Sequence, residues 1–276
     1  MCSTNYSRTN TLLKIQDVSL NINGFQILKN VNAEIKDIVR PGMVQGQIVG
    51  FLGPSGIGKT TLFNIMAGFT QPTTGEVWIN NPPEKVKVGR IGVVQQNYPL
   101  FNHRSVWDNL VIAAKNNLHL GKGEIKSKCE EILEMFELIQ HKNFYPNQLS
   151  GGQRQRIAIA QQLICSEKFL LLDEPFSGLD VNMVEKVSQM LVKIANFNEE
   201  NTIIIVSHDI YSTAAISDTL WVMGRDRTPE GEIIPGSYIK HVYDMIEEDL
   251  AWHENIQTDA KFVSIMKDIK AKFKTL

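Results

Sequence analysis

Short apolar runs of strand length alternate with amphipathic segments of helix length along most of the chain. Several of the runs contain almost no polar interruption, which is typical of strands buried on both faces of a parallel sheet. Because strands and helices alternate, the pattern predicts an α/β fold with a mainly parallel sheet flanked by helices. The predicted buried strands are QIVGFLG (47–53), KFLLLDEP (168–175), NTIIIVSHD (201–209) and TLWVMG (219–224).

The helical segments have apolar residues three and four positions apart. They are predicted at 59–69, 105–118, 124–140 and 181–197. The region from about 98 to 165 is helical without an intervening strand, so we predict an α-helical subdomain inserted into the sheet scaffold. Within 124–140, one apolar stripe is expected to face the core, and it consists of Ile125, Cys129, Ile132, Leu133, Phe136 and Ile139.

Both ends of the chain depart from this alternation. Short β-branched segments broken by Asn and Gly at 12–35 predict an N-terminal antiparallel β-layer with tight turns. The Pro-Gly pair within 38–47 predicts a loop or hairpin excursion. Since Pro and Gly mark a change of composition after about 228, we expect a domain at 12–228 and a C-terminal extension at 229–276.

The extension ends in an amphipathic helical pattern between lysines. Its apolar stripe consists of Phe262, Ile265, Met266, Ile269 and Phe273. Such a stripe is expected to dock on the surface of its own domain. Binding to a partner or to a membrane surface is the alternative.

The composition narrows the possible function classes. Of the 276 residues, 43% are hydrophobic and 21% are charged, and the net charge of −2 gives no reason to expect nucleic-acid binding. The longest apolar runs are far below the roughly 20 residues of a membrane span. The polar first ten residues show no signal peptide, and three widely spaced cysteines fit a reducing compartment better than a metal site.

The segment GPSGIGKT (53–60) matches the phosphate-binding pattern G-x-x-x-x-G-K-[ST]. It follows a buried strand and opens a helix, which is the context that the motif requires; the alternative is a Gly-rich turn with a surface lysine. Inward-turned backbone N–H groups and the helix N-terminus would bind phosphate. Lys59 would reach the β- and γ-phosphates of ATP, and Thr60 would bind Mg²⁺. The candidate nucleotide-binding residues here are Gly53, Pro54, Ser55, Gly56, Ile57, Gly58, Lys59, Thr60 and Thr61.

Two acids and a histidine follow other buried strands. Because α/β sheets bind ligands at the carboxyl ends of their strands, Asp173, Glu174 and His208 are expected beside the phosphate loop. Asp173 would complete the Mg²⁺ shell and Glu174 would act as general base for an attacking water. His208 would contact the γ-phosphate or that water. The alternatives without a catalytic role are two solvated acids at the end of a strand and a structural or exposed histidine.

Three further motifs occur in a fixed order with these: VVQQNYPLF (93–101), LSGGQRQR (149–156) and SGLD (177–180). With this set, residues from about 12 to 225 resemble the nucleotide-binding subunit of an ATP-binding cassette (ABC) transporter. The resemblance implies an ABC-type P-loop NTPase fold. It also implies two such domains paired head to tail, with each ATP between the phosphate loop of one and the LSGGQ signature of the other.

The resemblance assigns roles to several further residues. Gln96 would contact Mg²⁺ and couple ATP to the membrane subunits, with the adjacent Gln95 as the alternative. Asp180 would bridge the two ATP sites. Residues of the signature would meet the γ-phosphate of the opposite ATP, and they are Ser150, Gly151, Gly152 and Gln153. In one isolated chain, Arg154 and Arg156 would be unfavourable so near a helix N-terminus, whereas a phosphate of a second chain's ATP would compensate them.

The family also has an aromatic residue that stacks on adenine. Counting back from Leu28 places Ile22 near that position, and Phe25 is the nearest aromatic residue. Phe25 is therefore the candidate, and packing in the core is its alternative.

A single cassette without membrane spans is the usual layout of importers in this family. The segments NYPLFNHRSVWDNL (97–110) and DEPFSGLD (173–180) resemble importer cassettes, including those for nitrate, sulfonate and taurine. This implies a peripheral protein on the cytoplasmic face of the inner membrane, paired with a second such subunit. Its partners would be membrane permease subunits and a solute-binding protein, without nucleic acid. The alternatives are a non-transport cassette ATPase that acts on ribosomes or DNA, and the energy subunit of an exporter.

Overall fold

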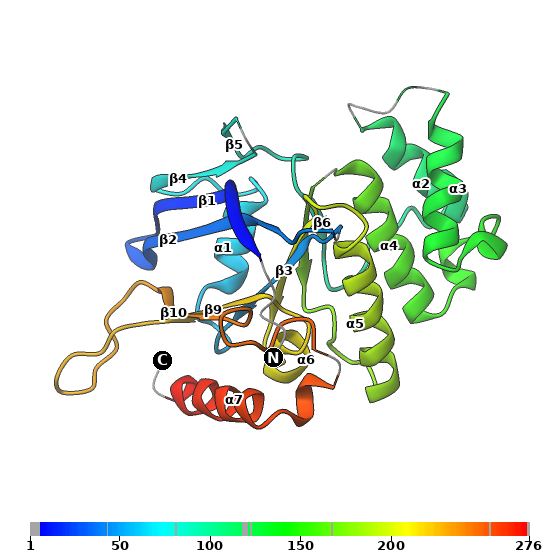
Figure 1. The fold of residues 1–276 in the computed structure, drawn as a ribbon. Coiled ribbons are helices and arrows are strands. Elements are labelled where there is room, and N and C mark those ends of the chain that lie inside the picture. The colour runs from blue at the N-terminus through cyan, green and yellow to red at the C-terminus, as the bar shows by residue number, and fades with distance from the viewer. Residues whose placement is uncertain are drawn as a thin grey trace.

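The chain folds into two β-sheets with helices around them (Figure 1). This computed structural model describes residues 6–42, 44–80, 82–117, 121, 123–166, 168–253 and 255–274. Cys2 and Leu118, which belong to the predictions above, lie outside the described residues. Among the described residues, no helix combines the length and the apolar character that crossing a membrane requires.

The larger sheet has the strand order β10-β9-β3-β8-β7-β6 and is parallel except for the edge strand β10. β3 and β8 are buried along their whole length. The predicted α/β fold class with a mainly parallel sheet is confirmed, and the carboxyl ends of β3, β8 and β7 lie side by side. The bounds are β3 (Gln47–Leu52), β6 (Gly92–Val94), β7 (Phe169–Asp173), β8 (Thr202–Ser207), β9 (Thr219–Gly224) and β10 (Tyr238–Asp244).

The smaller sheet is the expected N-terminal antiparallel layer, with the order β2-β1-β4-β5. A tight turn at Asn23 and Gly24 joins β1 to β2, and both residues have positive φ, as hairpin turns of this length require. β2 runs through residue 39, so the loop that we predicted from 38 begins later. The bounds are β1 (Ser7–Ile22), β2 (Phe25–Val39), β4 (Thr74–Ile79) and β5 (Glu84–Lys85).

The two faces of the larger sheet carry separate cores because alternate strand residues point to opposite sides. Ile203 and Ile205 of β8 pack with the helical region, whereas Ile204 and Val206 pack with α1 and the smaller sheet. The described helices are α1 (Lys59–Met66), α2 (Val106–Lys115), α3 (Ile125–Met135), α4 (Gly151–Cys165), α5 (Val181–Ala195), α6 (Ile210–Ala214) and α7 (Ala260–Phe273); short 3₁₀ turns are η1 (Ile139–His141), η2 (Pro146–Gln148) and η3 (Ile256–Thr258).

The predicted helix at 124–140 is too long. α3 ends at Met135 because Glu137 adopts a left-handed backbone conformation, with φ 57°. The turn η1 continues the path of the chain, and Cys129, Ile132 and Leu133 of the predicted stripe are buried in the helical core. Each buried Ile or Leu side chain stabilises the fold by roughly 1.5–3 kcal/mol relative to its exposed state.

The helix α7, in the predicted C-terminal extension, packs on the larger sheet. In α7, Phe262, Met266 and Ile269 are buried against Leu220 and Val222 of β9, among others. Figure 1 shows α7 beneath the larger sheet, next to α6. The favoured expectation for the apolar stripe therefore agrees with the structure.

Asp218, which directly precedes β9, is buried, and its backbone carbonyl accepts a hydrogen bond of 2.9 Å from the N–H of Met245, the residue after β10. Its carboxylate accepts a hydrogen bond of 2.7 Å from the backbone N–H of Ile48. Burial raises the pKa of Asp218 to about 7, partly opposed by that hydrogen bond and by the charge of Arg40. Between about pH 4 and pH 7, the folded protein therefore keeps a proton on Asp218 that the unfolded chain has already released.

We expect Asp218→Asn to remove this pH dependence. The stability of the wild type should fall relative to the variant as the pH rises from 5 to 8, by at most about 3 kcal/mol, and should level off above pH 7. Urea unfolding of both proteins at pH 5, 6, 7 and 8 measures the difference. Parallel stability curves for the two proteins would contradict the buried, protonated carboxyl.

Candidate functional site

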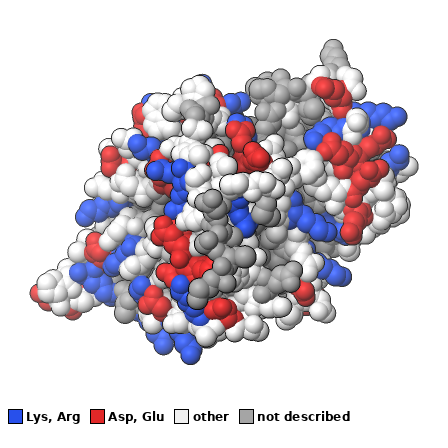
Figure 2. All heavy atoms as spheres, viewed as in Figure 1, with Lys and Arg blue, Asp and Glu red and all other residues white. Residues whose placement is uncertain are grey.

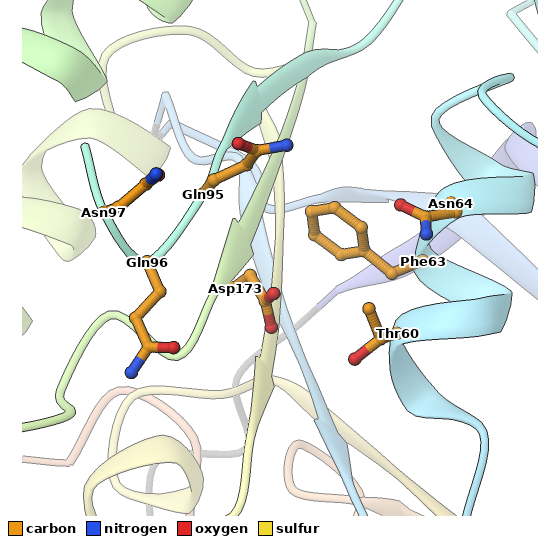
Figure 3. A pocket seen from close by; sticks show the side chains of 7 residues that line it. All are labelled: Thr60, Phe63, Asn64, Gln95, Gln96, Asn97 and Asp173. Atoms are coloured by element: carbon orange, nitrogen blue, oxygen red, sulfur yellow. The ribbon is translucent and has the colours of Figure 1, made fainter. Parts of the chain in front are cut away.

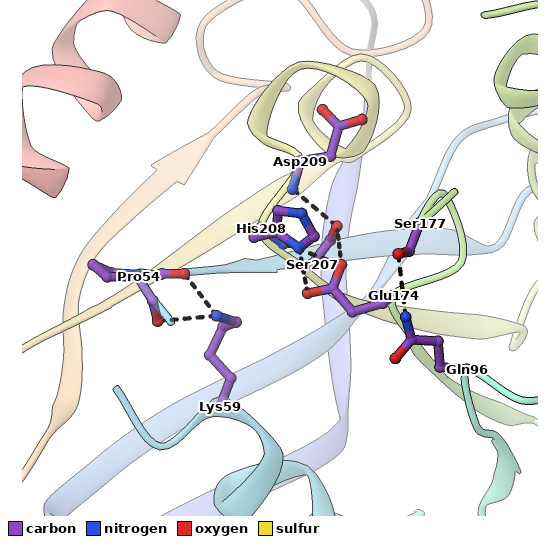
Figure 4. Close-up of polar contacts among 9 residues, drawn as sticks. Pro54, Lys59, Gln96, Glu174, Ser177, Ser207, His208 and Asp209 are labelled. Carbon is purple, nitrogen blue, oxygen red and sulfur yellow. Dashed lines mark hydrogen bonds and ion pairs between the residues drawn. The ribbon is translucent and has the colours of Figure 1, made fainter. Parts of the chain in front are cut away.

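The candidate site lies where β3, β8 and β7 end. The phosphate loop at 53–58 follows β3, Asp173 ends β7, and His208 follows β8. Parallel pairing places these three strands next to one another, so the predicted residues meet at one edge of the sheet. Figure 4 shows Lys59, Glu174 and His208 in this arrangement.

The phosphate loop adopts a conformation that glycine permits. Gly56 has φ 75° and Gly58 has φ 101°, and Gly58 directly precedes α1. A Cβ atom at Gly58 would lie 3.2 Å from the Leu28 side chain of β2, so the loop is packed closely against the smaller sheet. Together, the loop and the first turn of α1 form the backbone setting for an anion.

Lys59 lies within this loop and is only 8% exposed. Its Nζ donates hydrogen bonds to the carbonyl oxygens of Gly53 (2.7 Å) and Pro54 (3.1 Å). Burial lowers the pKa of Lys59, and the charges of Glu174 and Asp173 oppose this shift. The ammonium group is therefore held beside the loop, where a bound phosphate would stabilise its charge.

A cavity of about 590 Å³ lies between α1 and the end of β7. Figure 3 shows Thr60 and Asp173 on opposite sides of this space, with Gln95 and Gln96 on the adjoining loop. The described residues that line it are Thr60, Phe63, Asn64, Gln95, Gln96, Asn97 and Asp173.

These residues fit a magnesium ion. Hydroxyl, carboxylate and amide oxygens are the ligands that Mg²⁺ prefers. Burial raises the pKa of Asp173, and the Glu174 charge adds to this effect while Lys59 opposes it. A divalent cation in the cavity would offset the cost of ionising the Asp173 carboxylate there.

Glu174 occupies a strained position next to His208. Its φ of 50° is rare for a residue with a side chain, and its carboxylate lies 2.8 Å from His208 Nδ1. Ser207 donates its hydroxyl proton to the same carboxylate at 2.9 Å, and the His208 backbone N–H donates at 3.3 Å. The strained backbone and these donors fix the direction of the Glu174 carboxylate (Figure 4).

Gln96 and Gln95 remain two candidates for one role. Both are exposed on the loop after β6 and both line the cavity. Gln96 also donates a hydrogen bond of 3.1 Å to the hydroxyl of Ser177, which belongs to the segment after Glu174. Gln96 is therefore connected to the acid-bearing segment as well as to the cavity.

The sequence motifs did not single out Ser177 and Ser207 as site residues. A polar residue at the exit of a buried strand was an available signal for Ser207. Ser177 is the first residue of the motif SGLD, but its contact with Gln96 could not be predicted because it depends on the path of two loops.

The signature residues are placed differently. Ser150 caps α4, where its hydroxyl accepts from the Gln153 backbone N–H (3.3 Å) and the Gln153 side chain accepts from the Ser150 backbone (2.8 Å). Asp180 caps α5 in a similar way, accepting from Met183 at 3.0 Å. The described cavity lining includes none of the residues 150–153 and does not include Asp180. Within one chain, the signature residues and Asp180 thus do not line the cavity at Thr60 and Asp173.

The two arginines at the start of α4 have different surroundings. Arg156 donates a hydrogen bond of 2.9 Å to the Phe136 carbonyl at the end of α3. This contact within one chain compensates the unfavourable position of its positive charge near the N-terminus of α4. Arg154 is exposed.

Phe25 lies at the start of β2 and is 73% exposed, so the alternative of core packing is wrong. Ile22, across the hairpin, is also exposed. The residues of β2 that lie near the phosphate loop are Ile27 and Leu28. Adenine stacking on Phe25 stays a prediction.

Comparison with known proteins agrees with this geometry. The family described as ABC transporter matches residues 38–177. The sulfate/thiosulfate import ATP-binding protein CysA of Pseudomonas aeruginosa is 36% identical over 220 residues, which cover 77% of this chain and 64% of that protein. The spermidine/putrescine import ATP-binding protein PotA of Thermotoga maritima is 36% identical over 240 residues, or 84% of this chain and 60% of that protein. The chain therefore spans about three fifths of the length of these relatives.

A solved structure is similar over most of the chain. It is the dimeric ATP-binding cassette MJ0796 in a post-hydrolysis state with ADP and phosphate, which is 28% identical with a TM-score of 0.64. The similarity covers 85% of this chain and 99% of that one. The family match at residues 38–177 includes the phosphate loop and the described residues that line the cavity. The chain therefore belongs to the ABC transporter family and carries the ATP-binding domain of that family.

Proposed function

We propose that this chain is an ATP-hydrolysing subunit that powers the import of a solute through separate permease subunits. The observation that carries the proposal is the division of phosphate-directed groups between two places. Lys59 and its loop, which leads to Thr60 in the cavity wall, form one. The capped N-terminus of α4 at Ser150 forms the other, and residues 150–153 are not among the described residues that line that cavity. Two copies arranged head to tail would join these two places in each ATP site.

In the proposed reaction, the phosphate loop binds the triphosphate through its backbone N–H groups and Lys59. Thr60 and Asp173 would hold Mg²⁺, with Gln96 as a further ligand. The metal would supply positive charge that stabilises the transferring phosphoryl group. Ile57 and the other loop residues between Gly53 and Thr61 would supply the backbone N–H groups that surround the phosphates.

Glu174 would orient and deprotonate the attacking water as general base. His208, which lies 2.8 Å from that carboxylate, would hold the γ-phosphate and the water in line. Asp180 and the signature residues 150–153 of the second chain would close the site over the γ-phosphate. Loss of that phosphate removes the charge that joins the two chains, so they separate.

The descriptions of the two relatives support import over export. CysA and PotA are both described as import ATP-binding proteins. By analogy, this chain would bind permease subunits at the cytoplasmic face of a membrane, together with a solute-binding protein. The solute itself is recognised by those other subunits.

The distribution of charge on the surface does not favour the alternative of an ATPase that acts on nucleic acid. Figure 2 shows Lys and Arg mixed with Asp and Glu over the face in view. DNA binding by bulk electrostatics would need an excess of positive charge, whereas the net charge is −2.

Isolation of the tagged chain from detergent-solubilised membranes tests the proposed function. We expect it to be recovered with integral membrane proteins and to remain with them after nuclease and high-salt washes, because the contact with a permease does not depend on nucleic acid. Mass spectrometry of the recovered complex identifies the partners. Recovery with ribosomes or DNA and without a membrane protein would overturn the transport function, and membrane subunits that work without a solute-binding protein would favour export.

A further inference from the structure

The connection between β9 and β10, residues 225–237, lies against the phosphate loop. Arg225 is the first residue after β9 and is partly buried. Its Nη2 donates a hydrogen bond of 3.0 Å to the carbonyl oxygen of Gly56, in the middle of the loop. A residue from the C-terminal part of the chain thus contacts the candidate nucleotide site.

A second set of contacts holds Arg225 in place. Its Nε donates to the Ser237 hydroxyl at 3.0 Å, and Lys240 donates to the Arg225 carbonyl at 2.9 Å. Ser237 is completely buried. The guanidinium group is therefore fixed between a buried hydroxyl and the phosphate loop.

Ser237 in turn is bound to β2. Its backbone N–H donates to the Ile27 carbonyl at 2.9 Å, and its carbonyl accepts from the Lys29 N–H at 3.0 Å. A Cβ atom at Gly236 would lie 2.6 Å from the Lys29 side chain, so the contact is close. In Figure 1, this connection extends below β2, beside β9 and β10. The smaller sheet, the connection and the phosphate loop form one continuous hydrogen-bonded unit.

The Gly56 carbonyl belongs to the same peptide group as the Ile57 N–H. Among the described residues, that N–H donates only a long hydrogen bond of 3.4 Å, to the Pro54 carbonyl. A guanidinium group that binds the carbonyl polarises the peptide and strengthens its N–H as a donor. It also fixes the orientation of the peptide plane, because the peptide bond is rigid.

We propose that Arg225 is a positioning residue for nucleotide phosphates, acting through the Gly56–Ile57 peptide. It orients and polarises this peptide so that the Ile57 N–H is ready to donate to a phosphate oxygen of a nucleoside di- or triphosphate. This inference rests on the proposed function, because it requires that the loop binds a nucleotide.

Calorimetric titration with Mg-ADP measures the effect without hydrolysis. We expect Arg225→Ala to weaken Mg-ADP binding about tenfold, as expected for loss of a charge-assisted hydrogen bond. In Mg-ATP hydrolysis, KM should rise by a similar factor while kcat changes less than twofold, since Arg225 contacts neither the attacking water nor Glu174. Arg225→Lys keeps the charge but cannot contact both Gly56 and Ser237 in the same way. Its affinity for Mg-ADP should lie between that of the wild type and that of Arg225→Ala.

Arg227→Ala is the matched control, because Arg227 is exposed in the same connection and donates to the Gly231 carbonyl. It should bind Mg-ADP like the wild type. Ser237→Ala is a milder second variant, which removes the hydroxyl but keeps the backbone bonds to β2, and it should weaken binding about threefold or less. A purely structural role would lower the melting temperature without nucleotide and leave the affinity of the folded protein unchanged, and that result overturns the inference.

The two proposals fail in distinguishable ways. A wild type that binds no Mg-ADP overturns the proposed function and this inference together. A wild type that binds Mg-ADP, with Arg225→Ala and Ser237→Ala binding equally well, overturns this inference alone.

Discussion

Lys59→Ala is expected to slow ATP hydrolysis by roughly 10²- to 10³-fold and to weaken Mg-ATP binding. Alanine removes the ammonium group that the structure holds at the carbonyls of Gly53 and Pro54, beside the proposed phosphate site. Preorganised charge aimed at a transferring phosphoryl group is usually a large contribution to catalysis, and removal of one such donor has an effect of about this size. Phosphate release at saturating Mg-ATP and calorimetric titration measure the two effects.

Lys267→Ala provides the control, since Lys267 is exposed on α7, away from the phosphate loop. It should hydrolyse ATP at the rate of the wild type. Melting temperatures without nucleotide show whether the Lys59 variant is folded. Hydrolysis at the wild-type rate by folded Lys59→Ala would rule out the phosphate-loop assignment.

Much of the site could be predicted because local patterns determine it. The motif at 53–60 specifies a strand, a turn and a helix, and the structure has β3, the loop and α1 in this order. The position of Asp173 and His208 followed from one topological rule, that parallel strands end at the same edge of a sheet. That rule needs only the identification of β7 and β8 as parallel strands.

Contacts between side chains were beyond the sequence patterns. The patterns placed Glu174 and His208 at one edge, but the 2.8 Å contact depends on the left-handed backbone at Glu174. No residue preference predicts that conformation for glutamate. Arg225 was missed for a related reason, since its partner Gly56 lies 169 positions earlier in the chain.

The edge strand β10 was not predicted, and the helix ends were predicted less well than the central strands. β10 pairs with β9 alone at the edge of the larger sheet, and most of its residues are only partly buried. It therefore lacks the continuous apolar run that identified the central strands. Similarly, apolar spacing continues past Met135, where the backbone at Glu137 ends α3. In both cases tertiary packing, and not local preference, decides the outcome.

Glu174→Gln is expected to lower kcat by roughly 10²- to 10⁴-fold, the usual contribution of a general base. Glutamine has the same shape and can still accept the Ser207 hydrogen bond, but it cannot take a proton from water. Mg-ATP should remain bound, and the variant should accumulate as a dimer because the γ-phosphate that joins the two chains persists. Phosphate release and light scattering after size-exclusion chromatography measure these results.

Ser150→Arg in the Glu174→Gln background tests whether the dimer uses the signature. An arginine at the cap of α4 would lose the hydrogen bond from Gln153 and place its bulk where the second chain's ATP would bind. We expect the double variant to bind Mg-ATP as a monomer with unchanged affinity. Loss of ATP binding by the double variant would place Ser150 in the ATP site of its own chain. Normal turnover by the single variant Glu174→Gln would show that another group is the base. Only the combination of retained ATP, lost turnover and lost dimer fits a site whose two phosphate-directed parts come from different chains.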